Sequence, residues 1–153
     1  MVYYLDSSIA VKRYALEKGS DWAKSIFTPT ADNKVYLGQI GIVEIAAALS
    51  KKVRTQELTQ ENYEAALDLF LAAVENEEYF IASLNEEIVS GAVDLTRRHP
   101  LRGYDAVHLA TAIALNTTFS EASLPSLAFA SSDKILCEAA QKEGLVVSNL
   151  NEQ

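Results

Sequence analysis

The feature that most constrains the fold is a regular alternation of short β-like runs with longer helical segments. Five runs have the length and composition of strands: Val2–Leu5, Val35–Gln39, Tyr79–Ser83, Leu127–Ala130 and Leu145–Ser148. Apolar residues at helical spacing lie between them, at Ser8–Glu17, Val43–Val53, from Thr59 onward, and at Asn85–Arg98, Asp105–Asn116 and Lys134–Lys142. Short strands that alternate with helices are typical of a parallel sheet covered on both faces. The sequence therefore predicts an α/β fold, with a single domain over residues 1–153.

Glycine and capping residues set the expected ends of these segments. Gly19 is expected to break the first helix, and Ser20 with Asp21 to cap a short helix that follows. Four serines are expected to cap the first and the last helix: Ser7, Ser8, Ser131 and Ser132.

Four acidic residues stand where such a sheet would gather them into one site. Asp6 ends the first run, Glu44 follows the second by a short turn with glycine, and Asp133 follows the fourth. Asp105 begins the most apolar helical segment. Ligands of open α/β sheets bind beyond the carboxyl ends of the strands, so these side chains are expected to converge there. Carboxylates repel one another unless a cation holds them, and an all-oxygen site suits Mg²⁺ or Mn²⁺. The pattern indicates metal-dependent phosphodiester chemistry.

A simpler interpretation exists for each acid taken singly. Asp and Glu are favoured at helix starts, where they meet free backbone N–H groups and the positive end of the helix dipole. A structural or interaction protein whose four acids are all caps therefore stays open, and it predicts no response of stability to Mn²⁺. Ser, Thr or Asn would cap as well, yet all four positions carry an ionisable acid. This regularity favours a shared acidic site.

Three further residues stand close to these acids in the sequence. His108 lies one turn after Asp105 on the same helix face, where a packed, hydrogen-bonded histidine is more common than a ligand or a base. Ser7 and Ser131 also suit a second role, orienting a carboxylate or a water on the metal.

Several enzyme classes lose their support in this sequence. It contains no GxGxxG, Walker A, HExxH or GxSxG motif, which disfavours nucleotide motors, zinc proteases and serine hydrolases. Haloacid-dehalogenase phosphatases carry a second Asp two residues after the strand-ending one, and this chain has Ser8 there.

Composition indicates a globular protein of the cytoplasm. Apolar residues make up 49% of the chain and charged residues 22%. No apolar run approaches the roughly 18 residues of a membrane helix, so no membrane association is expected. The single Cys137 is expected to be a small core residue. A net charge of −8 does not itself predict nucleic-acid binding, which usually needs a basic surface.

Four motifs together match a known family. They are Tyr4-Leu5-Asp6-Ser7-Ser8, Val43-Glu44-Ile45, the segment from Arg102 to Ala112, and Ser131-Ser132-Asp133. In these motifs and their order, which span nearly the whole chain, the sequence resembles the PIN-domain ribonucleases, in particular the VapC-like toxins of bacterial and archaeal toxin–antitoxin pairs. Gly103 is a minor departure, since Ala would be equally at home there.

The resemblance implies a fold, an activity and partners. It implies a three-layer α/β/α fold with a central, mainly parallel sheet, and Mg²⁺ or Mn²⁺ held by Asp6, Glu44, Asp105 and Asp133. It also implies endonucleolytic cleavage of RNA to a 5′-phosphate and a 3′-hydroxyl, a homodimer, and a small antitoxin that inhibits the site. Basic residues are then expected to line the approach of RNA, either Lys12 or Arg13 or the group of Arg97, Arg98 and Arg102. A non-catalytic PIN-fold RNA-binding or scaffold module, a processing nuclease and a DNA-directed flap-type nuclease stay open as alternatives.

Overall fold

The strands form one five-stranded, fully parallel sheet in the order β3-β2-β1-β4-β5. The computed structural model describes residues 1–149. The strands are β1 (Val2–Leu5), β2 (Lys34–Gly38), β3 (Phe80–Ala82), β4 (Ala128–Ser131) and β5 (Val146–Asn149). The chain proceeds outward from β1 to β2 and β3, then returns to the other side of β1 for β4 and β5. The order therefore reverses between β1 and β4, and such a switch point opens a crevice at the carboxyl ends of the strands.

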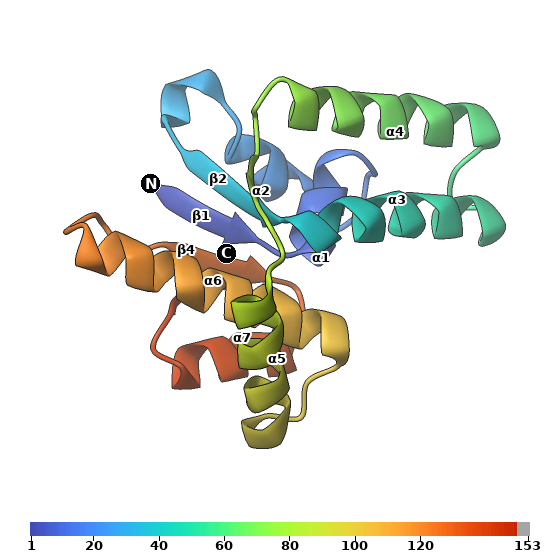
Figure 1. Cartoon of the computed structure of the whole chain (residues 1–153). Coiled ribbons are helices and arrows are strands. Elements are labelled where there is room, and N and C mark those ends of the chain that lie inside the picture. Colours follow the sequence, from blue (N-terminus) through green and yellow to red (C-terminus); the bar gives the residue numbers. More distant parts are fainter. Residues whose placement is uncertain (150–153) are drawn as a thin grey trace.

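Helices cover both faces of this sheet, which makes three layers (Figure 1). The short helices are α1 (Ser7–Ala10), η1 (Val11–Arg13), α2 (Ser20–Ser25) and η2 (Pro29–Ala31). The longer ones are α3 (Gln39–Arg54), α4 (Gln60–Glu75), α5 (Glu86–Arg98), α6 (Gly103–Glu121) and α7 (Lys134–Lys142). Helix α3 packs on α4, α5 packs on α6, and α7 contacts α6, β4 and β5. The predicted parallel sheet with helices on both faces is confirmed.

Side chains along the central strands point alternately to the two faces of the sheet, and this divides the core into two hydrophobic clusters. Leu5 of β1 and Ala130 of β4 face a cluster built with α1, α3 and α4. Their neighbours Tyr4 and Phe129 face the opposite cluster, built with α5, α6 and α7. Successive side chains of a strand point to opposite faces, so a strand buried on both faces is apolar at every position. This explains why the strands appear in the sequence as continuous apolar runs.

The first helical segment is shorter than predicted. A helix over Ser8–Glu17 was expected, but α1 and η1 together end at Arg13. The chain then turns, and the Ser20 hydroxyl accepts a hydrogen bond from the Glu17 amide and donates one to the Ala15 carbonyl. Ser20 is thus the first residue of α2 and not its cap, since Gly19, at φ 90°, occupies the cap position.

Two other helices begin at places that the sequence did not predict. Helix α3 starts at Gln39, directly after β2 and without the expected turn, and Gly38 is its cap residue. Glu44 consequently lies in the second turn of α3, so the interpretation of this acid as a helix cap is wrong. Helix α6 extends from Gly103 to Glu121, beyond the predicted Asp105–Asn116, and the buried Phe119 packs its last turn against the core.

The four serines do not cap the helices as predicted. Asp6 caps α1, accepting a hydrogen bond from the Ile9 amide at 3.2 Å, and Asp133 caps α7, accepting one from the Leu136 amide at 3.0 Å. A charged carboxylate is a stronger acceptor than a hydroxyl at the positive end of a helix. Within residues 1–149, none of the helices combines the length and the apolar character that a membrane crossing needs.

Candidate functional site

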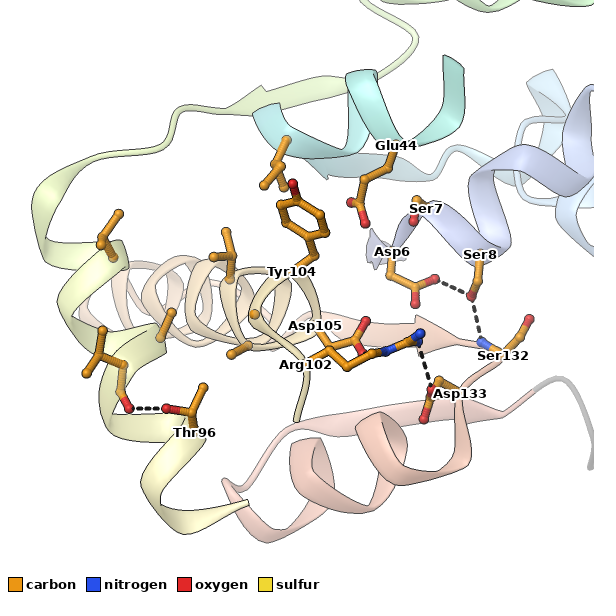
Figure 2. Close-up of a pocket in the computed structure, with 17 residues that line it drawn as sticks. Asp6, Ser7, Ser8, Glu44, Thr96, Arg102, Tyr104, Asp105, Ser132 and Asp133 are labelled. Carbon is orange, nitrogen blue, oxygen red and sulfur yellow. Dashed lines mark hydrogen bonds and ion pairs between the residues drawn. The ribbon is translucent and has the colours of Figure 1, made fainter. Parts of the chain in front are cut away.

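A pocket of about 800 Å³ lies at the carboxyl ends of the strands, and all four predicted acids line it (Figure 2). Asp6 comes from the end of β1, Glu44 from α3, Asp105 from the first turn of α6, and Asp133 from the start of α7. Residues more than 120 positions apart in the chain meet here because β1 and β4 are neighbours in the sheet. The switch point between these two strands is thus the place where the acids gather.

Asp6 is the most buried acid of the site, with only 4% of the residue exposed. Its Oδ1 accepts hydrogen bonds from the Ser8 hydroxyl at 2.6 Å and from the Ile9 amide, and its Oδ2 accepts one from the Ser131 hydroxyl at 2.6 Å. Burial raises the pKa of Asp6 above its usual range, and these hydrogen bonds offset only part of the effect. A carboxylate in this position gains from a nearby cation.

Two serines join the ends of β1 and β4 through this aspartate. The Ser131 hydroxyl, which donates to Asp6, accepts a hydrogen bond from the Asp133 amide at 3.0 Å. The Ser8 hydroxyl accepts one from the Ser132 amide at 2.9 Å. Ser7 lines the pocket, but within residues 1–149 no hydrogen bond joins its side chain to the acids. Ser8 therefore takes the place beside Asp6 that the sequence analysis assigned to Ser7.

The basic side chain of Arg102 lies between the other two aspartates of the pocket, Asp105 and Asp133. The Arg102 Nε donates to Asp105 Oδ2 at 3.1 Å, and its Nη2 lies 3.7 Å from Asp133 Oδ2 (Figure 2). The side chain of Arg102 is 82% exposed, so solvent weakens both ion pairs. These exposed contacts hold Arg102 only weakly to the two acids.

Glu44 is held from behind by His108. The imidazole is buried on α6, and its Nε2 forms a hydrogen bond with Glu44 Oε1. Its Nδ1 lies 2.9 Å from the Tyr4 hydroxyl. His108 is therefore packed and hydrogen-bonded, as expected, but no local pattern in the sequence indicates that Tyr4 is its second partner.

An apolar wall extends the pocket away from the acids. It consists of Val89, Ala92 and Val93 of α5 with Ile40 of α3 and the ring of Tyr104. Val89, Val93 and Tyr104 are all largely exposed. The pocket thus offers carboxylates at one end and an apolar surface with one aromatic ring at the other, a combination suited to a ligand with both charged and apolar groups.

Comparison with known proteins identifies the family. A model of the PIN domain matches residues 3–142. The chain belongs to the PIN domain family. Two curated relatives from Mycobacterium tuberculosis are ribonuclease VapC45 of strain CDC 1551 / Oshkosh and ribonuclease VapC49 of strain ATCC 25618 / H37Rv. Each is 31% identical over 116 residues, which cover 73% of this chain and 75% of the relative. The predicted resemblance to VapC-like PIN proteins is confirmed.

A solved structure shares the fold of this PIN domain. VapBC2 from Rickettsia felis, bound to a DNA fragment from their promoter, matches with a TM-score of 0.62 at 15% identity. The match covers 97% of this chain and 98% of that chain. At such low identity the likeness shows the fold alone, and it confirms the three-layer α/β/α PIN-like architecture.

The donor atoms of this PIN domain suit a hard divalent cation. All four acids offer carboxylate oxygens, and Asp6 is buried with a raised pKa that a cation would offset. Within residues 1–149, no three His, Cys, Asp or Glu side chains converge closely enough to hold a metal ion as they stand. Mg²⁺ usually keeps several waters and needs only one or two carboxylates directly, so the donor set fits with part of the contacts through water.

Most basic residues proposed for the approach of RNA are engaged elsewhere in this PIN domain. The Lys12 ammonium lies 3.1 Å from Glu17 Oε1, and Arg13 stacks over the Phe27 ring while pairing with Glu78. Arg98 binds Glu143 through two nitrogens at 3.1 Å each. Arg97 is exposed on α5 beside Asp94. Of the five expected residues, only Arg102 lines the pocket.

Proposed function

We propose that this PIN-domain protein is a metal-dependent endoribonuclease that hydrolyses RNA phosphodiester bonds. The observation that carries the proposal is the convergence of Asp6, Glu44, Asp105 and Asp133 in one pocket at the switch point of the sheet. The M. tuberculosis relatives named as ribonucleases support the choice of RNA as substrate. Hydrolysis by an activated water would leave RNA products with a 5′-phosphate and a 3′-hydroxyl.

Each acid has a part in this scheme. Asp6, Asp105 and Asp133 would hold Mg²⁺ or Mn²⁺ directly or through water, and Glu44 would complete the cage. When bound, the cation supplies a lower pKa for a water and offsets charge that develops on the phosphoryl oxygens. Ser8 and Ser131 orient the two oxygens of Asp6. One of the carboxylates accepts the proton of the attacking water.

Arg102 is the basic residue best placed to meet the substrate. Its guanidinium is exposed at the mouth of the pocket and pairs with Asp105 and Asp133 only through solvent-weakened contacts. An arriving phosphate offers oxygens that a guanidinium binds well. On a protein with a net charge of −8, this arginine and the bound cation would be the local attraction for RNA.

A small antitoxin is proposed as the protein partner, in keeping with a toxin of the VapBC type. The pocket would accept a peptide that places a basic side chain on the acids and apolar side chains on the wall formed by Val89 and Val93. A basic side chain there would replace the charge of the cation. Homodimerisation and a cytoplasmic location stay predictions.

One observation favours a non-catalytic PIN-fold RNA-binding or scaffold module as the second candidate. Among the described residues 1–149, no three of the acids that share the pocket lie close enough to hold a metal ion as they stand, and Arg102 already provides a cation for two of them. This alternative predicts that Mn²⁺ neither stabilises the fold nor supports cleavage.

Thermal unfolding with and without millimolar Mn²⁺ tests the proposal, together with cleavage of a mixed RNA pool by the same samples. The wild type should be stabilised, by about 2.7 kcal/mol when Mn²⁺ is present at about 100 times its Kd, and should cleave RNA. Asp6→Asn and Asp105→Asn should lose both responses while remaining folded. Asp68→Asn, an exposed aspartate on α4, serves as the matched control and should retain both. A wild type without stabilisation or cleavage would contradict the proposal.

A further inference from the structure

Three side chains from three elements form a continuous hydrogen-bonded chain behind the pocket. The Tyr4 hydroxyl of β1 lies 2.9 Å from His108 Nδ1 of α6, and His108 Nε2 bonds to Glu44 Oε1 of α3. Tyr4 is fully buried and His108 is 1% exposed, so water does not compete for the contact between them, whereas Glu44 keeps 20% of its side chain exposed to the pocket. Buried hydrogen bonds of this kind hold their geometry more firmly than exposed ones.

The chemistry of the three groups sets the order of donors and acceptors when the imidazole is neutral. A carboxylate only accepts, so His108 Nε2 must donate to Glu44. In a neutral imidazole the other nitrogen then accepts, and the Tyr4 hydroxyl donates to Nδ1. The hydrogen bond from Tyr4 thus fixes the tautomer and the ring orientation of His108.

The backbone at the start of α3 leaves room for this arrangement. A Cβ at position 38 would lie 2.5 Å from the Tyr4 hydroxyl oxygen. A Cβ at position 41 would lie 2.6 Å from Leu37 Cδ1 and 3.4 Å from His108 Cε1. Gly38 has a φ of −66°, which any residue adopts, so the need for glycine there is one of space. Gly38 and Gly41 let β1 and α6 bring the tyrosine and the histidine against α3.

The hydrogen-bonded chain from Tyr4 through His108 ends on only one of the two oxygens of Glu44. Oε1 is bonded to His108, and within the described part of the chain no hydrogen bond reaches Oε2. Figure 2 shows the Glu44 carboxylate directed toward the side of the pocket where Asp6 lies. Fixing one oxygen of a carboxylate from behind sets the direction of the other.

We propose that Tyr4 and His108 are positioning residues that hold Glu44 so that its second oxygen faces the cation. The inference rests on the proposed metal-dependent function and adds two residues to its site. Partners behind a metal ligand commonly change metal affinity by about 10–100-fold when they are removed. Neither Tyr4 nor His108 lines the pocket, so in this proposal they act only through Glu44.

The test is a titration of the full chain with Mn²⁺ followed by electron paramagnetic resonance, with kcat and KM for RNA cleavage measured alongside. His108→Leu should weaken Mn²⁺ binding by about 10–100-fold, and Tyr4→Phe should weaken it by a smaller factor. His108→Gln places an amide donor near Glu44 and should restore part of the affinity. Both weakening variants should lower kcat more than they raise KM.

Two controls separate positioning from a general loss of stability. Tyr79→Phe removes another buried tyrosine hydroxyl, which lies 2.9 Å from the Tyr14 hydroxyl on the opposite face of the sheet. It should lower the unfolding midpoint in EDTA about as much as Tyr4→Phe, but leave the Mn²⁺ affinity unchanged. In a Glu44→Ala background, Tyr4→Phe should have no further effect on Mn²⁺ affinity, since the chain acts only through that carboxylate.

The outcomes distinguish this inference from the function on which it rests. Wild-type Mn²⁺ binding with unchanged affinity in Tyr4→Phe and His108→Leu would overturn the positioning role and leave the nuclease proposal standing. A wild type that does not bind Mn²⁺ would overturn both. If His108→Leu does not fold, Tyr4→Phe and its combination with Glu44→Ala still decide, because the loss of one hydroxyl changes the packing little.

Discussion

At the scale of the residue, opposing effects act on the pKa of Asp6. Burial disfavours its charged form, whereas the hydroxyls of Ser8 and Ser131 and the Ile9 amide favour it, and the net result is a raised pKa. Without a cation, the folded protein therefore binds the proton of Asp6 more tightly than the unfolded chain does, where an aspartate has a pKa of about 3.9. The site is built to gain from a positive charge.

The raised pKa of Asp6 predicts a pH dependence of stability in the metal-free protein. Its contribution to the free energy of unfolding is fully present below the unfolded pKa of about 3.9, and it is lost as pH rises through the folded pKa. The wild type in EDTA should therefore lose stability relative to Asp6→Asn as pH rises. Urea unfolding of both proteins between about pH 4 and pH 8 measures this difference. A constant difference across that range would contradict the raised pKa.

At the scale of the element, the limited room beside the Tyr4 hydroxyl explains why α3 starts after a glycine. Gly38 ends β2 and caps α3, so the chain passes from strand to helix without a loop. The Tyr4 hydroxyl occupies the volume that a side chain at position 38 would need. By contrast, a Cβ at Gly103, the first residue of α6, meets no atom within 4 Å. The expectation that Ala is equally at home at position 103 is confirmed by this open space.

We expect substitution by alanine to change the free energy of unfolding differently at these two glycines. Gly38→Ala should lower the free energy of unfolding by about 1–3 kcal/mol, because overpacking displaces Tyr4. Gly103→Ala should leave it unchanged or raise it by up to about 1 kcal/mol, since alanine restricts the unfolded chain and favours the helix. Urea unfolding of the two variants gives both values. Equal losses would show that room for Tyr4 is not what requires glycine at position 38.

At the scale of the whole molecule, one sheet separates two hydrophobic clusters. Ile45 of α3 belongs to the cluster on one face, and Ile88 of α5 to the cluster on the other. Both clusters share the backbone of β1 and β4, whose residues alternate between them. Since neither cluster can lose its strands without exposing the other, we expect the described residues 1–149 to unfold as one unit.

Conservative substitutions in the two clusters test this single domain. Ile45→Val and Ile88→Val should each lower the free energy of unfolding by about 0.5–1.5 kcal/mol, through the loss of one buried methylene group. The two losses should add in the double variant, because the sites share no partner. Unfolding followed by Trp22 fluorescence and by far-ultraviolet circular dichroism should give coincident transitions. Two separate transitions, each shifted by one substitution, would instead indicate two independent units.

Periodicity and strand-ending acids made the layers and the acidic end of the pocket predictable. The apolar runs at β1 and β4 and the spacing of Ile88, Ala92 and Leu95 in α5 are local properties of the sequence. In a parallel sheet, residues that follow neighbouring strands meet at one edge, so Asp6 and Asp133 could be placed together in advance. Helix ends were less predictable, because competing caps such as Ser7 and Asp6 differ by small local energies.

Only the tertiary structure decided which side chains stand behind and between these acids. The bonds from Tyr4 to His108 and from His108 to Glu44 join residues 104 and 64 positions apart. The contact of Arg102 with Asp133 likewise depends on how α6 and α7 pack. A single sequence records which residues favour a strand or a helix, since that preference is local. It does not record which distant side chains come within hydrogen-bonding distance, because sheet order and helix packing set those distances.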